Sequence, residues 1–309
     1  MVEQPAQVRP ALPVPKYIWN LYSRVQNEDI DSIRHYYPQT VMEANDKMLL
    51  LRYNLTVSAQ NSTDEVIISA VLKLKLSRSV KLKRVKVHEI DQQNPDILRL
   101  IDSRQLEPET KKDHLWIDMD VSEALTRRRP NMDRVDFAVE ITNADLTPAS
   151  PFSASSVSGL SSTKTKEAAL VVYIQSSDAS RVRRKRRTNE KRRKQQKSKN
   201  ARITTTLCHR RELLIDFRQL GWNDWIIAPE NYKAYQCQGE CPYPLPNSMN
   251  TTNHAIVQGI LSSINPEKVP PPCCVPIEMG SLPLLYTDVD GTIVVKKYPD
   301  MQVKTCGCR

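Results

Sequence analysis

The stretch CQGECPYP, residues 237–244, sets two cysteines four positions apart with Gly239 between them. The chain ends on CGCR, residues 306–309, where Gly307 again separates two cysteines. Two bridges between these stretches, first cysteine to first and second to second, would close a ring of five plus three, or eight, residues. A third disulfide could pass through this ring only if no bulky side chain filled it, a condition that glycine meets. The pattern therefore favours knotted disulfides.

The other cysteines fit this interpretation without fixing the connectivity. All seven lie between Cys208 and Cys308, and pairing six of seven allows 7 × 15 = 105 arrangements. Cys273 and Cys274 are adjacent, and neighbours in an extended chain point to opposite faces. One of them can enter the ring and reach Cys208, while the other faces outward. An outward cysteine in an oxidising compartment favours a bond to a second chain.

A metal site is the alternative use of these cysteines. Zinc sites favour C-x2-C pairs, whereas the spacings here are C-x3-C, CC and C-x-C, with His209 and His254 nearby. We therefore expect no metal and no cofactor. The sequence also shows no nucleophile–base pattern and no phosphate-binding loop, so we expect no enzymatic activity.

The positive charge is confined to one segment. Residues 181–202 hold 13 Lys and Arg against one Glu, a net of +12, while the whole chain of 309 residues is +10. The rest sums to −2, which argues against a nucleic-acid-binding surface on the folded parts, and we expect no DNA partner. No apolar run reaches the ~18 residues that a membrane helix needs, so we expect no membrane insertion.

Hydrophobic periodicity predicts the regular elements. A helix is expected within PKYIWNLYSRVQ (15–26), and a second over 253–265, capped by Asn253. Asp290-Gly291 between two apolar runs predicts a hairpin. Strands, several with the alternation of half-buried antiparallel strands, are expected at 48–59, 65–76, 81–90, 133–142, 169–175 and 212–217, with a short strand and helix in HLWIDMDVSEALTRR.

The segment from Cys208 to Arg309 resembles the cystine-knot growth factors of the transforming growth factor-β superfamily. The resemblance rests on the order C…CQGEC…CC…CGCR, together with GWNDWIIAP, GECPYP, TTNHAIVQ and CCVPIEM. TTNHAIVQ and GWNDW look like the bone morphogenetic protein branch, whereas WIIAPENYKAYQCQGECP and VPPPCC slightly favour the Nodal branch. PKYIWNLYSR and WIDMDVSEAL resemble the family's prodomain.

The resemblance implies a fold class in two parts. The mature region, 203–309, is expected to be a small all-β cystine knot with one helix, as a disulfide-linked dimer. The prodomain, 1–180, is expected to be α+β, with mainly antiparallel strands and an N-terminal helix. No signal peptide is visible in it, so we expect a chain truncated before residue 1. The implied disulfides are Cys208–Cys274, Cys237–Cys306 and Cys241–Cys308, with Cys273 bonded to its counterpart in the dimer.

Residues 181–202 join the two parts and carry two cleavage motifs, RVRR and RKRR, of the kind that furin-like convertases cut. A nuclear-localisation or nucleic-acid tract is the alternative, and the cystine pattern that follows disfavours it. A cut would leave residues 188–202 as a +6 tail, with seven basic residues and one Glu, able to hold heparan sulfate. The expected cleavage residues are Arg181, Arg184 and Arg187. Glycosylation is expected at the sequons of Asn54, Asn61 and Asn250.

Receptor contacts are expected on exposed apolar side chains, because aromatic residues are common binding hot spots. Trp222 and Trp225 flank a turn in a domain with little interior, so we interpret them as an interface rather than as core. The apolar face of the helix at 253–265 is expected to pack against a partner chain in a twofold dimer. The resemblance implies a type I receptor epitope at Trp222, Trp225, Tyr243 and Leu245. It implies a type II receptor surface that includes Ala228, Leu285 and Val295.

These expectations describe a secreted growth factor precursor. A furin-like convertase would release a dimeric ligand that assembles type I and type II serine/threonine kinase receptors and triggers Smad signalling in embryonic patterning. The expected partners are these receptors, the chain's own prodomain, a second ligand chain in a homodimer or alternatively a heterodimer, heparan sulfate and, as a further candidate, a co-receptor. Two alternatives stay open: a secreted cystine-knot antagonist that binds such ligands, and a nuclear basic protein.

Overall fold

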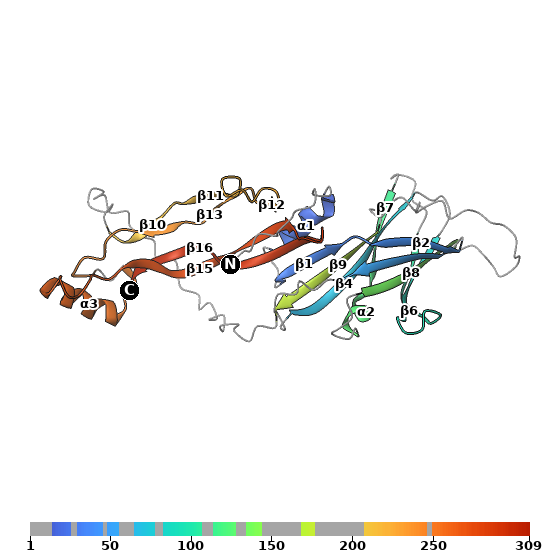
Figure 1. Cartoon of the computed structure of the whole chain (residues 1–309), viewed down its shortest axis with the longest axis horizontal. Helices are drawn as coiled ribbons and strands as arrows, with labels where there is room; N and C mark the ends of the chain where they lie inside the picture. Colours follow the sequence, from blue (N-terminus) through green and yellow to red (C-terminus); the bar gives the residue numbers. More distant parts are fainter. Residues whose placement is uncertain are drawn as a thin grey trace, which may run out of the picture. The chain divides into compact units, whose positions relative to one another are not determined.

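The computed structural model describes residues 14–25, 30–45, 48–55, 65–77, 83–106, 114–127, 134–143, 168–176, 207–245 and 249–309. The chain divides into two compact units, which are described separately. The N-terminal unit is built around Ala6–Ser177, and the C-terminal unit around Asp178–Tyr286 and Lys296–Arg309. Thr287–Val295, the tip of a hairpin described below with the C-terminal unit, groups with the N-terminal unit. Figure 1 colours the chain from blue at the N-terminal end to red at the C-terminal end.

The N-terminal unit is a sandwich of two antiparallel sheets with two helices, α1 (Lys16–Val25) and α2 (Ser122–Thr126) (Figure 1). One sheet has the strand order β1-β9-β4-β7, and the other has the order β2-β3-β8-β5-β6. The first comprises β1 (Ser32–Tyr36), β9 (Ala168–Ser176), β4 (Glu65–Ser77) and β7 (His114–Asp120). The second comprises β2 (Thr40–Asn45), β3 (Met48–Asn54), β8 (Arg134–Asn143), β5 (Lys83–Ile90) and β6 (Leu98–Leu106).

The core of this unit lies between the two sheets. Leu72 and Leu74 of β4 are fully buried and belong to one cluster with Leu51 of β3 and Phe137 of β8. Alternate residues of β4 are only half-buried, because successive side chains of a strand point to opposite faces. Burying one such leucine or phenylalanine contributes about 1.5–3 kcal/mol. The predicted strand at 65–76 is therefore confirmed, with its apolar face toward the core.

Helix α1 is also confirmed. The predicted spacing places Ile18, Leu21 and Val25 on one stripe, and all three are buried. Val121 is the N-cap residue of α2, and its side chain makes no capping hydrogen bond. Asp120 instead accepts a hydrogen bond from the Ser122 amide at 2.9 Å. Helix formation at both places therefore follows from local sequence together with burial.

Three strands of the N-terminal unit were not predicted, namely β1, β2 and β6. All five residues of β1 are buried, including Arg34 and His35, so its two faces show no polar and apolar alternation. The Arg34 guanidinium lies 2.7 Å from the Glu65 carboxylate, which offsets part of the cost of burying it. β6 has the opposite character, since it lies at a sheet edge and most of its residues are exposed. The alternation of polar and apolar residues identifies strands with one buried and one exposed face. β1 is buried on both faces and β6 is largely exposed, so neither shows this alternation.

The C-terminal unit is built on a long hairpin of β15 (Cys274–Thr287) and β16 (Ile293–Cys308) (Figure 1). The hairpin predicted at Asp290-Gly291 is confirmed: the Gly291 amide donates to the Asp288 carbonyl at 2.9 Å, and Gly291 has φ +80°, which glycine adopts without strain. β12 (Ile226–Ala228) pairs with β15. The remaining pairs are β10 (His209–Arg211) with β14 (Gln236–Gln238), and β11 (Leu214–Asp216) with β13 (Asn231–Lys233).

One helix, α3 (Asn253–Ile264), completes the described part of this unit. In Figure 1 it lies at the same end of the hairpin as the C-terminus. The predicted cap is wrong by one residue. Thr252, rather than Asn253, precedes the first turn, and its hydroxyl accepts a hydrogen bond from the Ala255 amide at 3.2 Å. The fold class is confirmed: within the described residues, the C-terminal unit is small, mainly antiparallel and disulfide-rich with one helix, and the N-terminal unit has antiparallel strands and two helices.

Candidate functional site

The C-terminal unit is held together by three disulfides at one end of its hairpin. The Sγ atoms of Cys208, Cys241 and Cys308 lie within 4.8 Å of one another, so two of the bridges pass side by side. The Cα–Cα distances of 5.4, 5.7 and 5.9 Å lie in the usual range for disulfides. The bridges are Cys208–Cys274, Cys237–Cys306 and Cys241–Cys308, the same pairs that the resemblance implied.

Each of the two glycines of the knot meets a constraint that the sequence did not predict. A Cβ atom on Gly307 would lie 2.9 Å from the carbonyl oxygen of Met249 and 3.0 Å from that of Asn250. The loop before α3 therefore excludes a side chain at Gly307. Gly239 has φ +117°, a conformation that residues with a side chain rarely adopt. Its backbone conformation alone is enough to select glycine.

Cys273 is the seventh cysteine, and it is exposed and unpaired. Its amide donates to the carbonyl of Arg309 at 2.8 Å, and the Arg309 amide donates back at 3.0 Å. The Arg309 guanidinium also donates to the carbonyl of Asn250. These contacts hold Cys273 in a fixed backbone position next to the knot. The arrangement leaves its thiol available for a bond to another chain.

The exposed face of α3 is apolar. Ala255 and Gly259 lie on the buried face of α3. A Cβ on Gly259 would lie 3.8 Å from side-chain atoms of both Tyr243 and Leu245. The exposed large apolar side chains of α3 are Ile256, Val257, Ile260, Leu261 and Ile264. Five such residues on one short helix form a surface that soluble proteins usually cover with a partner.

Thr252 combines two functions, since it caps α3 and completes the sequon Asn250-Thr-Thr. Thr252→Ala should destabilise the C-terminal unit by about 1 kcal/mol, because a first-turn amide loses its acceptor. It should also abolish the glycosylation that the sequon predicts at Asn250. Thr252→Ser is the matched control, which keeps the hydroxyl and both functions. The measurements are urea unfolding and the glycosidase-sensitive gel shift. An unchanged unfolding midpoint in Thr252→Ala would contradict the cap.

The predicted receptor-binding tryptophans belong to a row of aromatic rings, named here the aromatic ladder. Trp222 lies 5.7 Å from Trp225 between ring centroids, and Trp225 meets Tyr286 edge-on at 5.7 Å. Trp225 is only 5% exposed, so the interpretation of both tryptophans as an exposed interface is wrong for Trp225. Its burial follows from packing between neighbouring rings. The ladder comprises Tyr232, Phe217, Trp222, Trp225, Tyr286 and Tyr298.

The other predicted receptor residues divide into exposed and buried groups. Tyr243 is 49% exposed and Leu245 is half-buried. Leu285 and Val295, at 0% and 2%, and Ala228, at 6%, are buried, so these three side chains are not themselves exposed. The reason is visible on β15, where four consecutive residues are buried and both faces of the strand are therefore covered.

The predicted processing residues lie mostly outside the described residues. Arg181, Arg184, Arg187, the tail 188–202 and Asn61 are among them. Asn54, the last residue of β3, is half-buried. Asn250 is exposed, and its φ of +45° places it in the left-handed region that asparagine tolerates better than most residues.

Sequence reasoning did not assign roles to several residues that build this site. Tyr286 and Tyr298 extend the aromatic ladder, and their hydroxyls lie 3.2 Å apart. Arg309 links Cys273, the residue before β15, to the loop before α3. Tyr286 and Tyr298 lie on the two strands of the predicted hairpin, which was the available signal for their contact. The role of Arg309 depends on contacts that are distant in sequence, so no local pattern announces it.

Metal binding has no support in the part of the chain that the structure describes. There, the only group of His, Cys, Asp or Glu close enough to share an ion is the sulfur cluster of the knot. These sulfurs are already bonded in disulfides and offer no thiolate. None of the described helices is long and apolar enough to cross a membrane.

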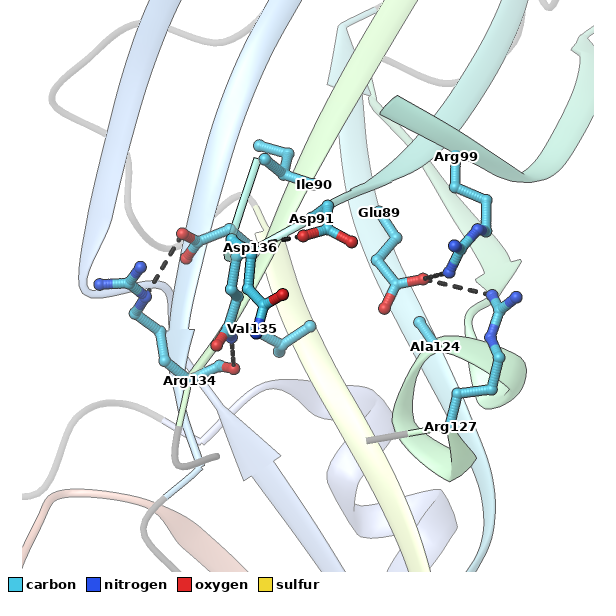
Figure 2. Close-up of a pocket in the computed structure, with 11 residues that line it drawn as sticks. Glu89, Ile90, Asp91, Arg99, Ala124, Arg127, Arg134, Val135 and Asp136 are labelled. Carbon is cyan, nitrogen blue, oxygen red and sulfur yellow. Dashed lines mark hydrogen bonds and ion pairs between the residues drawn. The ribbon is translucent and has the colours of Figure 1, made fainter. Parts of the chain in front are cut away.

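A cavity of about 190 Å³ lies in the N-terminal unit, between α2 and the ends of β5 and β8 (Figure 2). Glu89 accepts from Arg99 at 3.4 Å and from Arg127 at 3.2 Å. The Arg134 guanidinium lies 3.4 Å from the Asp136 carboxylate on the other wall. Because these charges are paired with one another in the walls, we interpret the cavity as a polar packing gap of the sandwich rather than as a ligand site.

Comparison with known proteins agrees with this geometry. Residues 207–308 match the family described as the transforming growth factor beta like domain. Protein dbl-1 of Caenorhabditis elegans is 39% identical over 314 residues, spanning 99% of this chain and 83% of that protein. Protein 60A of Drosophila melanogaster is 53% identical over 105 residues, 34% of this chain and 23% of that protein. Protein decapentaplegic of Drosophila pseudoobscura pseudoobscura is 49% identical over 102 residues, 33% of this chain and 17% of that protein.

The match to protein dbl-1 covers both units. The matches to the other two relatives extend over 105 and 102 residues, about the length of the matched growth factor domain. All three relatives are of the bone morphogenetic protein type, so the slight preference for Nodal is not confirmed. Proteins of this family are signalling growth factors rather than enzymes, and they are secreted. The chain therefore belongs to the transforming growth factor-β superfamily, as a ligand of the bone morphogenetic protein type.

Proposed function

We propose that the chain is a growth factor precursor whose C-terminal unit, residues 203–309, becomes a dimeric ligand after convertase cleavage. Residues 1–180 act as its prodomain, and the cut falls within 181–202, after Arg184 or Arg187. The ligand assembles type I and type II serine/threonine kinase receptors and triggers Smad phosphorylation. Given the relatives, we propose the Smad branch that bone morphogenetic proteins use.

The observation that carries this proposal is the exposed, unpaired Cys273 beside a complete knot. The other six cysteines are bonded within the chain, so this thiol has no internal partner. The apolar face of α3 gives a second reason for a partner, because exposed apolar surface gains about 25 cal/mol per Å² when it is covered. A second copy of the ligand would satisfy both needs. Heterodimers would use the same cysteine.

Receptor binding is proposed at two places on the cleaved ligand. Trp222, Tyr243 and Leu245 are at least partly accessible and would contact the type I receptor. Trp225 would support that epitope from within the aromatic ladder. Type II receptor contacts are proposed for the finger surface that includes Ala228, Leu285 and Val295, whose own side chains are buried.

Two further features of the proposal concern the extracellular surroundings. The tail 188–202 would hold heparan sulfate through its +6 charge, and this attraction would weaken as salt screens it. Glycans are proposed at Asn54, Asn61 and Asn250. A co-receptor is proposed only as an additional partner, for which no residue of this chain is assigned.

The test expresses the chain behind a borrowed signal peptide and applies the cleaved protein to responsive cells. Phosphorylation of the Smads of the bone morphogenetic protein branch is expected. The matched variant Cys273→Ser should keep the knot, run as a monomer on a non-reducing gel and signal more weakly. Phosphorylation of the activin/Nodal branch would instead return the Nodal assignment. No signal from a correctly linked dimer would favour the antagonist.

A further inference from the structure

Helix α1 is fixed to the β1-β9-β4-β7 sheet by a buried polar contact. Its apolar stripe is buried, and at its start the Tyr17 hydroxyl lies 2.5 Å from the Nε2 atom of His35 on β1. The Tyr17 ring also meets Trp116 of β7 edge-on, with 5.5 Å between ring centroids. α1 is therefore held by its apolar stripe, by an aromatic contact and by a hydrogen bond to His35. Of these groups, the His35 imidazole is the one that can take up a proton.

His35 is poorly placed to carry a charge. It is 1% exposed, and its Nδ1 atom has no hydrogen-bond partner among the described residues. The ring of Tyr37 stands edge-on to it at 4.6 Å between centroids. The nearby charged and titratable groups are Tyr17 of α1, Tyr37 after β1, Lys73 of β4, Asp118 of β7 and Tyr173 of β9.

None of these groups can balance an imidazolium at His35. Asp118 is already paired with Lys73, with 2.6 Å between Nζ and Oδ1, and the Lys73 ammonium lies 4.8 Å above the Tyr17 ring. Burial raises the pKa of the Tyr17 hydroxyl far above its usual range, so this group stays neutral. Burial, with a smaller effect from Lys73, lowers the pKa of His35 to about 4.

We propose that α1 is an acid-released latch, in which His35 takes up a proton only when α1 lifts off the sheet. While α1 is seated, the imidazole is neutral and shielded from water. Once α1 lifts, water can solvate the ring, and the ring titrates like an ordinary histidine. Acid therefore favours the lifted state. This regulation goes beyond the growth factor function, because it concerns the N-terminal unit alone.

The direction and size of the effect follow from linkage between protonation and opening. A histidine whose pKa is lowered by burial contributes no pH dependence above the ordinary value of about 6.5. Below it, the lifted state binds a proton that the seated state rejects, and the opening equilibrium rises about tenfold per pH unit. The rise ends near pH 4, where the seated state also accepts the proton. The total shift between these limits is about 300-fold.

Amide hydrogen exchange of the full chain between pH 7.5 and 4.5 tests the latch. Protection factors, corrected for the intrinsic exchange rate at each pH, are followed for the α1 peptide by mass spectrometry. They should change little above pH 6.5 and fall about 40-fold between pH 6.5 and 4.5. Peptides of β5 and β8 should keep their protection, because the sandwich core stays closed. A uniform loss in all peptides would mean global unfolding and would overturn the proposal.

Two variants separate the latch from general acid sensitivity. His35→Gln replaces the imidazole with a neutral amide that can still accept from Tyr17, and the pH dependence of α1 should disappear. His88→Gln, on β5 of the other sheet, is the matched control and should keep it. If His35→Gln does not fold, Tyr17→Phe gives the second test: lower protection at every pH, with the same slope below pH 6.5. A flat profile in the natural chain, or an unchanged slope in His35→Gln, would contradict the latch.

Discussion

Replacing Gly307 with alanine should destabilise the C-terminal unit by about 2–3 kcal/mol. The new Cβ would stand 2.9 and 3.0 Å from two backbone carbonyl oxygens of the loop before α3. Backbone oxygens cannot swing aside as the end of a flexible side chain can, so the loop itself must shift. That loop carries Asn250 and the cap of α3, and the shift should reach both. We therefore expect a loss of stability and a displaced helix.

The same substitution at Gly259 should have the opposite sign. Its new Cβ would meet side-chain atoms of Tyr243, Leu245 and Pro272 at 3.8–3.9 Å, which is ordinary van der Waals contact. Alanine also removes the entropic penalty of glycine inside a helix. The expected gain is about 0.5–1 kcal/mol. Comparing the two variants thus separates the steric effect of the new Cβ from the general effect of replacing glycine on stability.

Urea unfolding of oxidatively refolded residues 203–309 measures both effects. Protein concentration must be the same for every variant, because the stability of a dimer depends on it. A lower midpoint for Gly307→Ala and a higher one for Gly259→Ala are expected, with unchanged slopes. If Gly307→Ala unfolds at the midpoint of the natural sequence, the loop is looser than the distances imply.

Removing the Cys208–Cys274 bridge, by replacing both cysteines with alanine, should cost about 3–4 kcal/mol. The bridge spans 66 positions, and opening it gives the unfolded chain the conformational freedom of that loop. The other two bridges span nearly the same residues, so the cost should be slightly below that of an isolated loop. Cys308 and Cys241 would also lose sulfur neighbours within 4.8 Å.

Unfolding in urea again provides the measurement, with Cys273→Ser as the control. The control removes a cysteine without opening the knot, so it should lose the covalent dimer and keep the three internal bridges. The double variant should show the larger shift of the midpoint when both are compared under conditions that make them monomeric. Equal midpoints would mean that the third bridge adds little to the other two.

The sequence was sufficient to predict features that depend on local residue patterns or on the spacing of residues along the chain. The spacing of Ile18, Leu21 and Val25 predicted α1, and Asp290-Gly291 predicted the hairpin, because each pattern satisfies its own segment. The cysteine order led to the family and to the fold class. These features needed no knowledge of what packs against them.

Other features depend on partners that lie far away in the sequence. His35 is buried in β1 because other elements cover it, and nothing in SIRHY announces this burial. Trp225 was expected at the surface, but ring contacts with Trp222 and Tyr286 enclose it. A side chain at Gly307 is excluded by the backbone carbonyls of Met249 and Asn250, a constraint that the spacing of the cysteines does not contain. In each case the tertiary neighbour, rather than the local pattern, decides the outcome.

The aromatic ladder gives the ligand a built-in optical probe. The chain has four tryptophans, and two of them, Trp19 and Trp116, lie in the N-terminal unit. The tryptophan fluorescence of the cleaved ligand would therefore come only from Trp222 and Trp225, whose ring centroids are 5.7 Å apart. Transitions of rings this close couple, so the near-ultraviolet circular dichroism of the ligand should respond to small changes in their angle. Receptor docking on this part of the molecule could be followed without attaching a dye.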